Sequence, residues 1–182
     1  MTIQACEMLL YQGKCWKMYS TPLEAYFETI MPRPDGLHCH TALERGYVGT
    51  WEIVDGKLYL IGLDGYFFGR TNSLGQGEAL TVEGVFPGAG GRVFADWFSG
   101  FLRLPRGRVL AKTMIGFPLH EEELRVCMEH GVDQGCEVIR NLPPASTAAN
   151  SAPGYAGVPG FLLREEQDTW SPPLAGMAGD DA

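Results

Sequence analysis

The segment that most constrains the fold is 47–62, where two runs of alternating apolar residues flank Asp55-Gly56. Asp-Gly between such runs is typical of a two-residue type I′ turn, because both turn positions need a positive φ. A two-residue turn also fixes which residues lie opposite each other. We predict a core face made of Trp51, Ile53, Leu58 and Leu60, with Trp51 opposite Leu60 and Ile53 opposite Leu58.

Two elements are predicted before this hairpin. Residues 7–20 form a hairpin that turns at Gln12-Gly13. A helix over 21–31 follows, because Thr21 can cap it, a proline suits its first turn, and Glu24 occupies the return position of a capping box. The apolar stripe of this helix, at helical spacing, is Leu23, Tyr26, Phe27 and Ile30.

After the central hairpin the sequence predicts a loop and a strand. Residues 64–78 are rich in glycine, and a loop of that length is often functional. Residues 79–86 alternate enough to form a strand, which PGAGG would end.

A third hairpin is predicted over 92–107, with its turn at Ser99-Gly100. That register places Asp96 opposite Arg103, as a cross-strand ion pair. The PRGR sequence at 105–108 then predicts a turn into another strand, 109–117.

Residues 119–140 fit either a helix or two strands. Apolar residues at i, i+3 and i+4 from Leu124 fit a helix, whereas alternation from Leu124 to Met128 and a turn at His130-Gly131 fit strands. We favour strands, because the neighbouring segments are hairpins and consecutive hairpins need only short links.

The predicted fold is α+β and mainly β: an antiparallel meander of hairpins over 1–140, with one helix packed on the sheet. From residue 141 the composition changes to proline, alanine, glycine and serine. Such residues bury too little apolar surface to offset chain entropy. We therefore predict that 141–182 is a largely flexible acidic tail.

Charge and composition limit the class of partner. The formal net charge is −8, which disfavours binding to nucleic acid and favours a basic partner. No apolar run is long enough to span a bilayer, and the N-terminus lacks the pattern of a signal peptide. Five cysteines without a CxxC pair fit reduced thiols, so we expect a cytoplasmic protein with no membrane partner.

Catalytic and metal-binding patterns are weak. His38-Cys39-His40 offers ligand atoms and a thiol, but the paired ligand knuckles of a zinc site are missing, and neighbours on a strand point to opposite faces. Glu121–Glu123 is most simply a solvated cluster. No nucleotide-binding loop and no GxSxG or HExxH pattern occurs. We predict no catalytic residue, no metal and no cofactor.

The residues best suited to bind a ligand or partner fall in the predicted 64–78 loop and around the predicted basic turn. Aromatic residues in a loop can offer a binding surface, and arginines on an acidic background can bind an anion or protect a sheet edge. The candidate set is Tyr66, Phe67, Phe68, Arg70, Asp96, Arg103, Arg106 and Arg108.

Four blocks carry a family resemblance: LLYQGKCWKMYSTPLEAYF, RGYVGTWEI, KLYLIGLDG and VFPGAGGRVFADWFSGFLRLPRG. With them the chain resembles, over residues 8–140, a family of small bacterial proteins without an assigned function. In that family the region after the last hairpin continues as strands that end in a glycine turn. The chain departs from the family at AKTMIGFPLH and in its tail, and the resemblance implies no catalytic residue. A weaker likeness to MORN-type repeats lacks a true period.

These observations favour a non-catalytic cytosolic binding protein. Its predicted partner is a protein, such as a basic toxin that an immunity protein neutralises. The alternative is an enzyme or small-ligand protein with a site between the 64–78 loop and the 103–108 basic turn. A third option is a homo-oligomer formed through the face that carries Tyr59 and Ile61.

Overall fold

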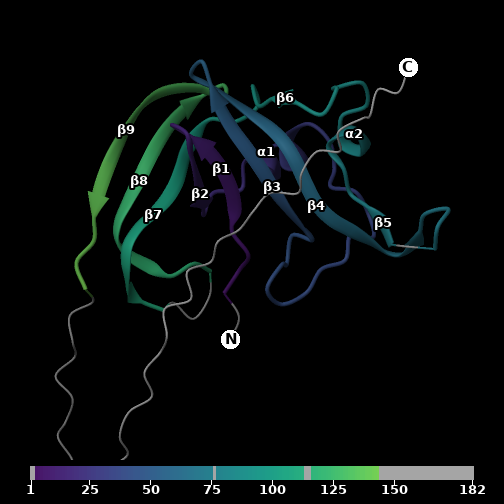
Figure 1. Cartoon of the computed structure of the whole chain (residues 1–182), viewed down its shortest axis with the longest axis horizontal. Helices are drawn as coiled ribbons and strands as arrows, with labels where there is room; N and C mark the ends of the chain where they lie inside the picture. The colour runs from purple at the N-terminus through teal and green to yellow at the C-terminus, as the bar shows by residue number, and fades with distance from the viewer. Residues whose placement is uncertain (1–2, 76, 113–115, 144–182) are drawn as a thin grey trace, which may run out of the picture. The chain divides into compact units, whose positions relative to one another are not determined.

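The computed structural model describes residues 3–75, 77–112 and 116–143 (Figure 1). They belong to one compact unit, Met1–Ala145. The predicted tail beyond residue 143 lies outside the described residues and stays a prediction. The same holds for the middle of the predicted strand 109–117.

Nine strands in the described part of the chain form one mixed, mostly antiparallel sheet, and two short helices accompany it. The strand order is β2-β1-β3-β4-β9-β8-β7, and β5 and β6 each pair with β4. The predicted mainly β fold is confirmed. The strands are β1 (Glu7–Tyr11), β2 (Lys14–Met18), β3 (Tyr47–Val54), β4 (Lys57–Thr71), β5 (Gly77–Ala79), β6 (Val93–Phe94), β7 (Gly100–Ala111), β8 (Leu119–Glu129) and β9 (Val132–Arg140), and the helices are α1 (Pro22–Thr29) and α2 (Val82–Val85).

Three hairpins turn where the sequence predicts. Trp51 lies opposite Leu60, and Asp55 and Gly56 have φ values of 51° and 70°. The β1–β2 hairpin turns at Gln12-Gly13. The β8–β9 hairpin turns at His130-Gly131, so the strand interpretation of 119–140 is confirmed.

The core is one cluster of buried side chains, to which the strands of the sheet and both helices α1 and α2 contribute. Trp51, Leu58 and Leu60 are fully buried, as predicted, and Ile53 packs against them. The other fully buried apolar side chains are Leu9, Met18, Leu23, Tyr47, Leu102, Leu104, Ala95 and Val126.

One ion pair is enclosed in this core. Glu7 is fully buried, and its Oε1 lies 3.0 Å from Nε of Arg45, in ion contact rather than in an aligned hydrogen bond. Trp51 donates its indole N–H to Oε2 of Glu7 at 2.5 Å. Burial raises the pKa of Glu7, and Arg45 and Trp51 oppose that rise.

The sheet differs from a simple meander in three ways, one of which is that β4 pairs with β9, at Lys57 and Val132. Strand β1 pairs in parallel with β3, because α1 and residues 30–46 connect the first two hairpins. The two end strands also meet, since Tyr19 donates its backbone N–H to the carbonyl of Arg103 at 2.8 Å. Ser20 extends this contact through its hydroxyl, which donates to the carbonyl of Phe101 at 2.7 Å.

Helix α1 forms where predicted, without the predicted capping box. Thr21 makes no side-chain cap, and Glu24 instead accepts a 2.5 Å hydrogen bond from the Tyr47 hydroxyl and pairs with Arg33. The predicted stripe is also shorter, because Ile30 is 60% exposed beyond the last helical turn. Glu24 therefore contacts Tyr47 and Arg33, which lie outside the helix, instead of completing the capping box.

The predicted loop 64–78 and strand 79–86 are wrong. Strand β4 continues to Thr71, since residues 36–38 pair with it: His38 donates its backbone N–H to Tyr66 O at 2.7 Å. After the short strand β5, Thr81 caps α2 by accepting from the N–H of Gly84 at 3.0 Å. A threonine cap followed by valines three residues apart favours a helical turn over an alternating strand.

The predicted third hairpin is also wrong. The chain turns at 95–98, where Phe98 donates to the carbonyl of Ala95, and β7 pairs with β8 instead. Asp96 therefore does not face Arg103. The predicted turn at 105–108 is a bulge within β7, where Gly107 has a φ of 71° and the register shifts.

Candidate functional site

Two adjoining cavities flank helix α2, and together we call them the α2 groove. One has a volume of about 540 Å³ and the other about 400 Å³, and both are lined by Met31 and Gly84. The larger cavity is mostly apolar, and the smaller one contains the charged residues Asp35, Arg70 and Glu78.

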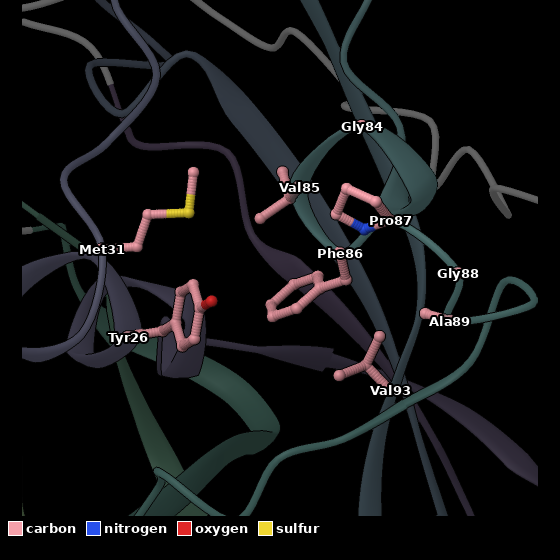
Figure 2. Close-up of a pocket in the computed structure, with 9 residues that line it drawn as sticks. All are labelled: Tyr26, Met31, Gly84, Val85, Phe86, Pro87, Gly88, Ala89 and Val93. Carbon is pink, nitrogen blue, oxygen red and sulfur yellow. The ribbon is translucent and has the colours of Figure 1, made fainter.

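The apolar cavity lies between α1 and α2. In Figure 2 the side chains of Tyr26 and Met31 face those of Val85 and Phe86. The Tyr26 and Phe86 rings are 4.8 Å apart, and Trp97 packs against both, at 4.9 and 5.5 Å between ring centroids. These contacts hold the Tyr26 and Phe86 side chains, which line the cavity, in place. Met31 stays 38% exposed, so the cavity opens to solvent.

The polar cavity lies between residues 31–35 and β5. Arg70 stacks on the Phe67 ring at 4.6 Å and donates to the backbone carbonyl of Asp35 at 3.4 Å. The side-chain carboxylates of Asp35 and Glu78 have no ion-pair partner among the described residues. This cavity therefore offers free carboxylates to a ligand.

The sequence-predicted aromatic residues divide between two faces of β4. Phe67 and Arg70 line the polar cavity. Tyr66 and Phe68 point elsewhere, and they are 55% and 75% exposed. Phe68 stacks on His38 with ring centroids 6.0 Å apart.

The predicted basic residues lie on β7 and line neither cavity of the groove. Each arginine meets a glutamate of β8: Arg103 pairs with Glu123 at 2.7 Å, Arg106 lies 3.9 Å from Glu122, and Arg108 pairs with Glu121. Asp96 is exposed in the 95–98 turn. The structure thus places Phe67 and Arg70 at the α2 groove and pairs the three β7 arginines with glutamates. Tyr66, Phe68 and Asp96 are exposed outside the groove.

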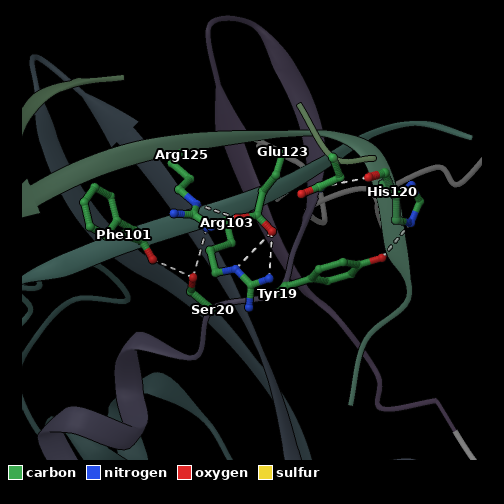
Figure 3. A network of polar contacts seen from close by, with 8 residues as sticks. Tyr19, Ser20, Phe101, Arg103, His120, Glu123 and Arg125 are labelled. Carbon is green, nitrogen blue, oxygen red and sulfur yellow. Dashed lines mark hydrogen bonds and ion pairs between the residues drawn. The ribbon is translucent and has the colours of Figure 1, made fainter. Parts of the chain in front are cut away.

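Figure 3 shows a polar network around Glu123 and, beside it, the contact of Tyr19 with His120. Arg103 donates to Oε2 of Glu123 at 3.0 and 2.7 Å, and Arg125 donates to Oε1 at 2.6 Å. Tyr19 shares a 2.9 Å hydrogen bond with Nε2 of His120, and burial raises the pKa of Tyr19 to about 12. All of these polar groups have partners, so the network is structural.

Burial of Glu123 opposes its ionisation, but hydrogen bonds from Arg103 and Arg125 outweigh burial and lower its pKa below the usual 4.5. Because the pKa of Glu123 is lower in the folded than in the unfolded state, its ionised form stabilises the fold above pH 4.5. This stabilisation is lost as the pH falls below 4.5. Glu123→Gln is therefore expected to lower the free energy of unfolding at pH 7 by about 1.5–3 kcal/mol. In urea denaturation, the loss of free energy of unfolding should become smaller below pH 4.5. Glu122→Gln is the control, and it should lower the free energy of unfolding less because Glu122 is more exposed.

The described residues carry neither a metal-binding cluster nor a membrane-spanning helix. No group of three or more histidine, cysteine or carboxylate side chains in the described ranges is arranged to hold a metal ion. Within those ranges, no helix is long and apolar enough to cross a bilayer. All five cysteines are free.

Sequence reasoning missed most of the apolar cavity. The sequence predicts Tyr26 on the apolar stripe of the helix over 21–31, Met31 at the end of that helix, and Val85 and Phe86 in a strand. The available signal was Thr81, because a threonine followed by an acidic residue and spaced valines is typical of a capped helical turn.

The chain was compared with protein-family models, with curated proteins and with solved structures, and none of the three comparisons gave a match. A functional proposal for this chain therefore rests on its own geometry.

Proposed function

We propose that the chain is a non-catalytic cytosolic binding protein that captures a basic protein partner at the α2 groove. One observation carries this proposal: an open apolar cavity continues into a cavity with free carboxylates. An exposed apolar surface bordered by polar groups is typical of a protein-interaction site.

The charges favour a basic partner. Every described arginine except Arg70 lies within ion-pair distance of a glutamate. Carboxylates without such partners, including Asp35 and Glu78 at the groove, therefore contribute to the net charge of −8. A field of this sign speeds the capture of a basic protein. A basic toxin neutralised by an immunity protein is a partner of this kind.

The test uses Met31→Arg, which places a positive charge where the two cavities meet. Val138→Arg is the matched control, because Val138 is similarly exposed, at 45%, and lies on β9. Tagged wild-type chain and Val138→Arg should retain the same protein from source cells, and Met31→Arg should lose it. With the purified partner, calorimetry should show at least about tenfold weaker binding for Met31→Arg.

Salt and growth provide further readouts. Binding should weaken as NaCl rises from about 0.05 to 0.5 M, because screening shortens the reach of exposed charges. If the partner is a toxin, co-expression of the wild-type chain should restore growth. Equal binding by Met31→Arg and wild type would exclude the α2 groove as the docking site.

A further inference from the structure

The polar cavity covers one face of β4, between two segments that pair with opposite edges of that strand. Residues 36–38 bond to one edge of β4, and β5 pairs with the other. Asp35 directly precedes the first segment, and Glu78 lies on β5. These two carboxylates therefore stand on either side of Phe67 and Arg70, which β4 contributes to the cavity.

Arg70 has no carboxylate partner in the described part of the chain, although two carboxylates line the same cavity. Its guanidinium stacks on the Phe67 ring at 4.6 Å and donates to the backbone carbonyl of Asp35 at 3.4 Å. A guanidinium has five N–H donors, so most of those of Arg70 are available to an anion.

Opposite charges that line one cavity without pairing fit a ligand that carries both charges. A carboxylate suits Arg70, because a guanidinium and a carboxylate can form two parallel hydrogen bonds. A cation suits Glu78, because Arg70 is tied to Asp35 on the other side of β4. Pro34, Phe67 and Leu80 also line the cavity, and an aliphatic stem can pack along such an apolar surface.

A C-terminal lysine or arginine residue combines these features. It carries an α-carboxylate and a side-chain cation, with an aliphatic stem between them. The cavity volume of about 400 Å³ lies in the range of small-ligand sites, so it suits the end of a chain better than a folded surface. Capture of a C-terminal carboxylate is a recurring mode of peptide recognition.

We propose that the partner inserts its C-terminal residue, a lysine or arginine, into the polar cavity. This inference rests on the proposed function and specifies which part of the partner is recognised. The α-carboxylate binds the guanidinium of Arg70, and the side-chain cation binds the carboxylate of Glu78. The preceding apolar residues extend toward the apolar cavity, which begins at Met31 and Gly84.

The probe is the peptide acetyl-Gly-Val-Val-Lys with a free C-terminal carboxylate, titrated into the full chain by isothermal titration calorimetry. It should bind with a Kd below about 1 mM, and the same peptide with a C-terminal amide should bind at least about tenfold more weakly. The sign of this difference is diagnostic. The amide is the more positive peptide, and the net charge of −8 would by itself favour it.

A third peptide ends in norleucine, which keeps the stem of lysine but lacks the cation, and it should also bind at least about tenfold more weakly. Arg70→Gln should bind the acid and the amide within about twofold of each other, because their difference depends on the guanidinium. Glu78→Gln should do the same for lysine and norleucine. Arg108→Gln is the matched control, since it removes an exposed arginine on β7, and it should keep both preferences.

The replaced side chains are all exposed, so the variants should fold, and circular dichroism checks this. The proposal is overturned if the amide binds as tightly as the acid, if Arg70→Gln still prefers the acid, or if no binding occurs at about 1 mM peptide. Tighter binding of free lysine than of the peptide would also overturn it, because the cavity would then be a site for a free amino acid.

The two proposals can fail separately. If any of these results occurs while Met31→Arg still loses the cellular partner, C-terminal recognition fails and the proposed function stands. If the peptides bind as expected but Met31→Arg retains the cellular partner, the proposed function fails.

Discussion

Replacing Arg45 with methionine is expected to lower the free energy of unfolding by about 3–5 kcal/mol, because Glu7 then remains buried without its counter-charge. The expectation follows from the geometry of the pair. Glu7 is fully buried, and Arg45 is 8% exposed. Urea denaturation followed by tryptophan fluorescence measures the change.

The pH dependence of this variant has a defined sign. Burial already raises the pKa of Glu7, and losing Arg45 removes an opposing influence. A carboxyl whose pKa is raised in the folded state contributes its full stability when the pH is below the pKa of the unfolded state, about 4.5. That contribution is lost as the pH rises. The deficit of Arg45→Met should therefore grow from pH 4.5 toward neutrality.

A rescue and a surface control complete the test. The double variant Glu7→Gln/Arg45→Met should recover much of the loss, because a neutral amide can still accept from Trp51. Arg140→Met, which breaks an exposed pair with Glu122, should cost no more than about 1 kcal/mol. If Arg45→Met lowers the free energy of unfolding by less than about 1 kcal/mol, the pair is not buried in solution.

Gly131→Ala is expected to destabilise the fold by more than about 4 kcal/mol, which combines backbone strain with a steric clash. Gly131 has a φ of 73°, and an added Cβ would lie 2.5 Å from Ala95 O and 2.8 Å from Ala95 C. These are backbone atoms and cannot rotate away. The N–H of Gly131 also donates to the carbonyl of Phe98, and its carbonyl accepts from the N–H of Leu58. Hydrogen bonds therefore hold the turn against two other segments.

The chain contains matched controls for this substitution. Gly13 and Gly56 occupy the same position in their turns, with φ values of 72° and 70°, and an added Cβ at either would meet nothing within 4 Å. Gly13→Ala and Gly56→Ala should thus show only the strain of a left-handed alanine, about 1–2 kcal/mol. Equal losses at Gly131 and Gly56 in urea denaturation would exclude the clash with Ala95.

Turn chemistry explains which elements are predictable from the sequence. Gln12-Gly13, Asp55-Gly56 and His130-Gly131 each adopt positive φ at both positions, and this preference is local. Once such a turn is placed, the register of its two strands follows, as for Trp51 opposite Leu60. Alternation then identified Leu58 and Leu60 as core.

Contacts between distant segments explain the failures. Strand β4 runs through the expected loop because residues 36–38 bond to it. Strand β7 pairs with β8 rather than β6, and the glutamates there neutralise the expected basic turn. For the candidate site, Phe67 and Arg70 came from the sequence, but Met31 and Phe86 did not, because α2 was not expected.

The sequence by itself determined the three tight turns, the register of their hairpins, helix α1 and the mainly β class, since φ preference and apolar alternation act between near neighbours. Only the tertiary structure decided the parallel pairing of β1 with β3, the pairing of arginines on β7 with glutamates on β8, and the groove beside α2. These depend on contacts between residues 13 or more positions apart, and such contacts leave no local pattern.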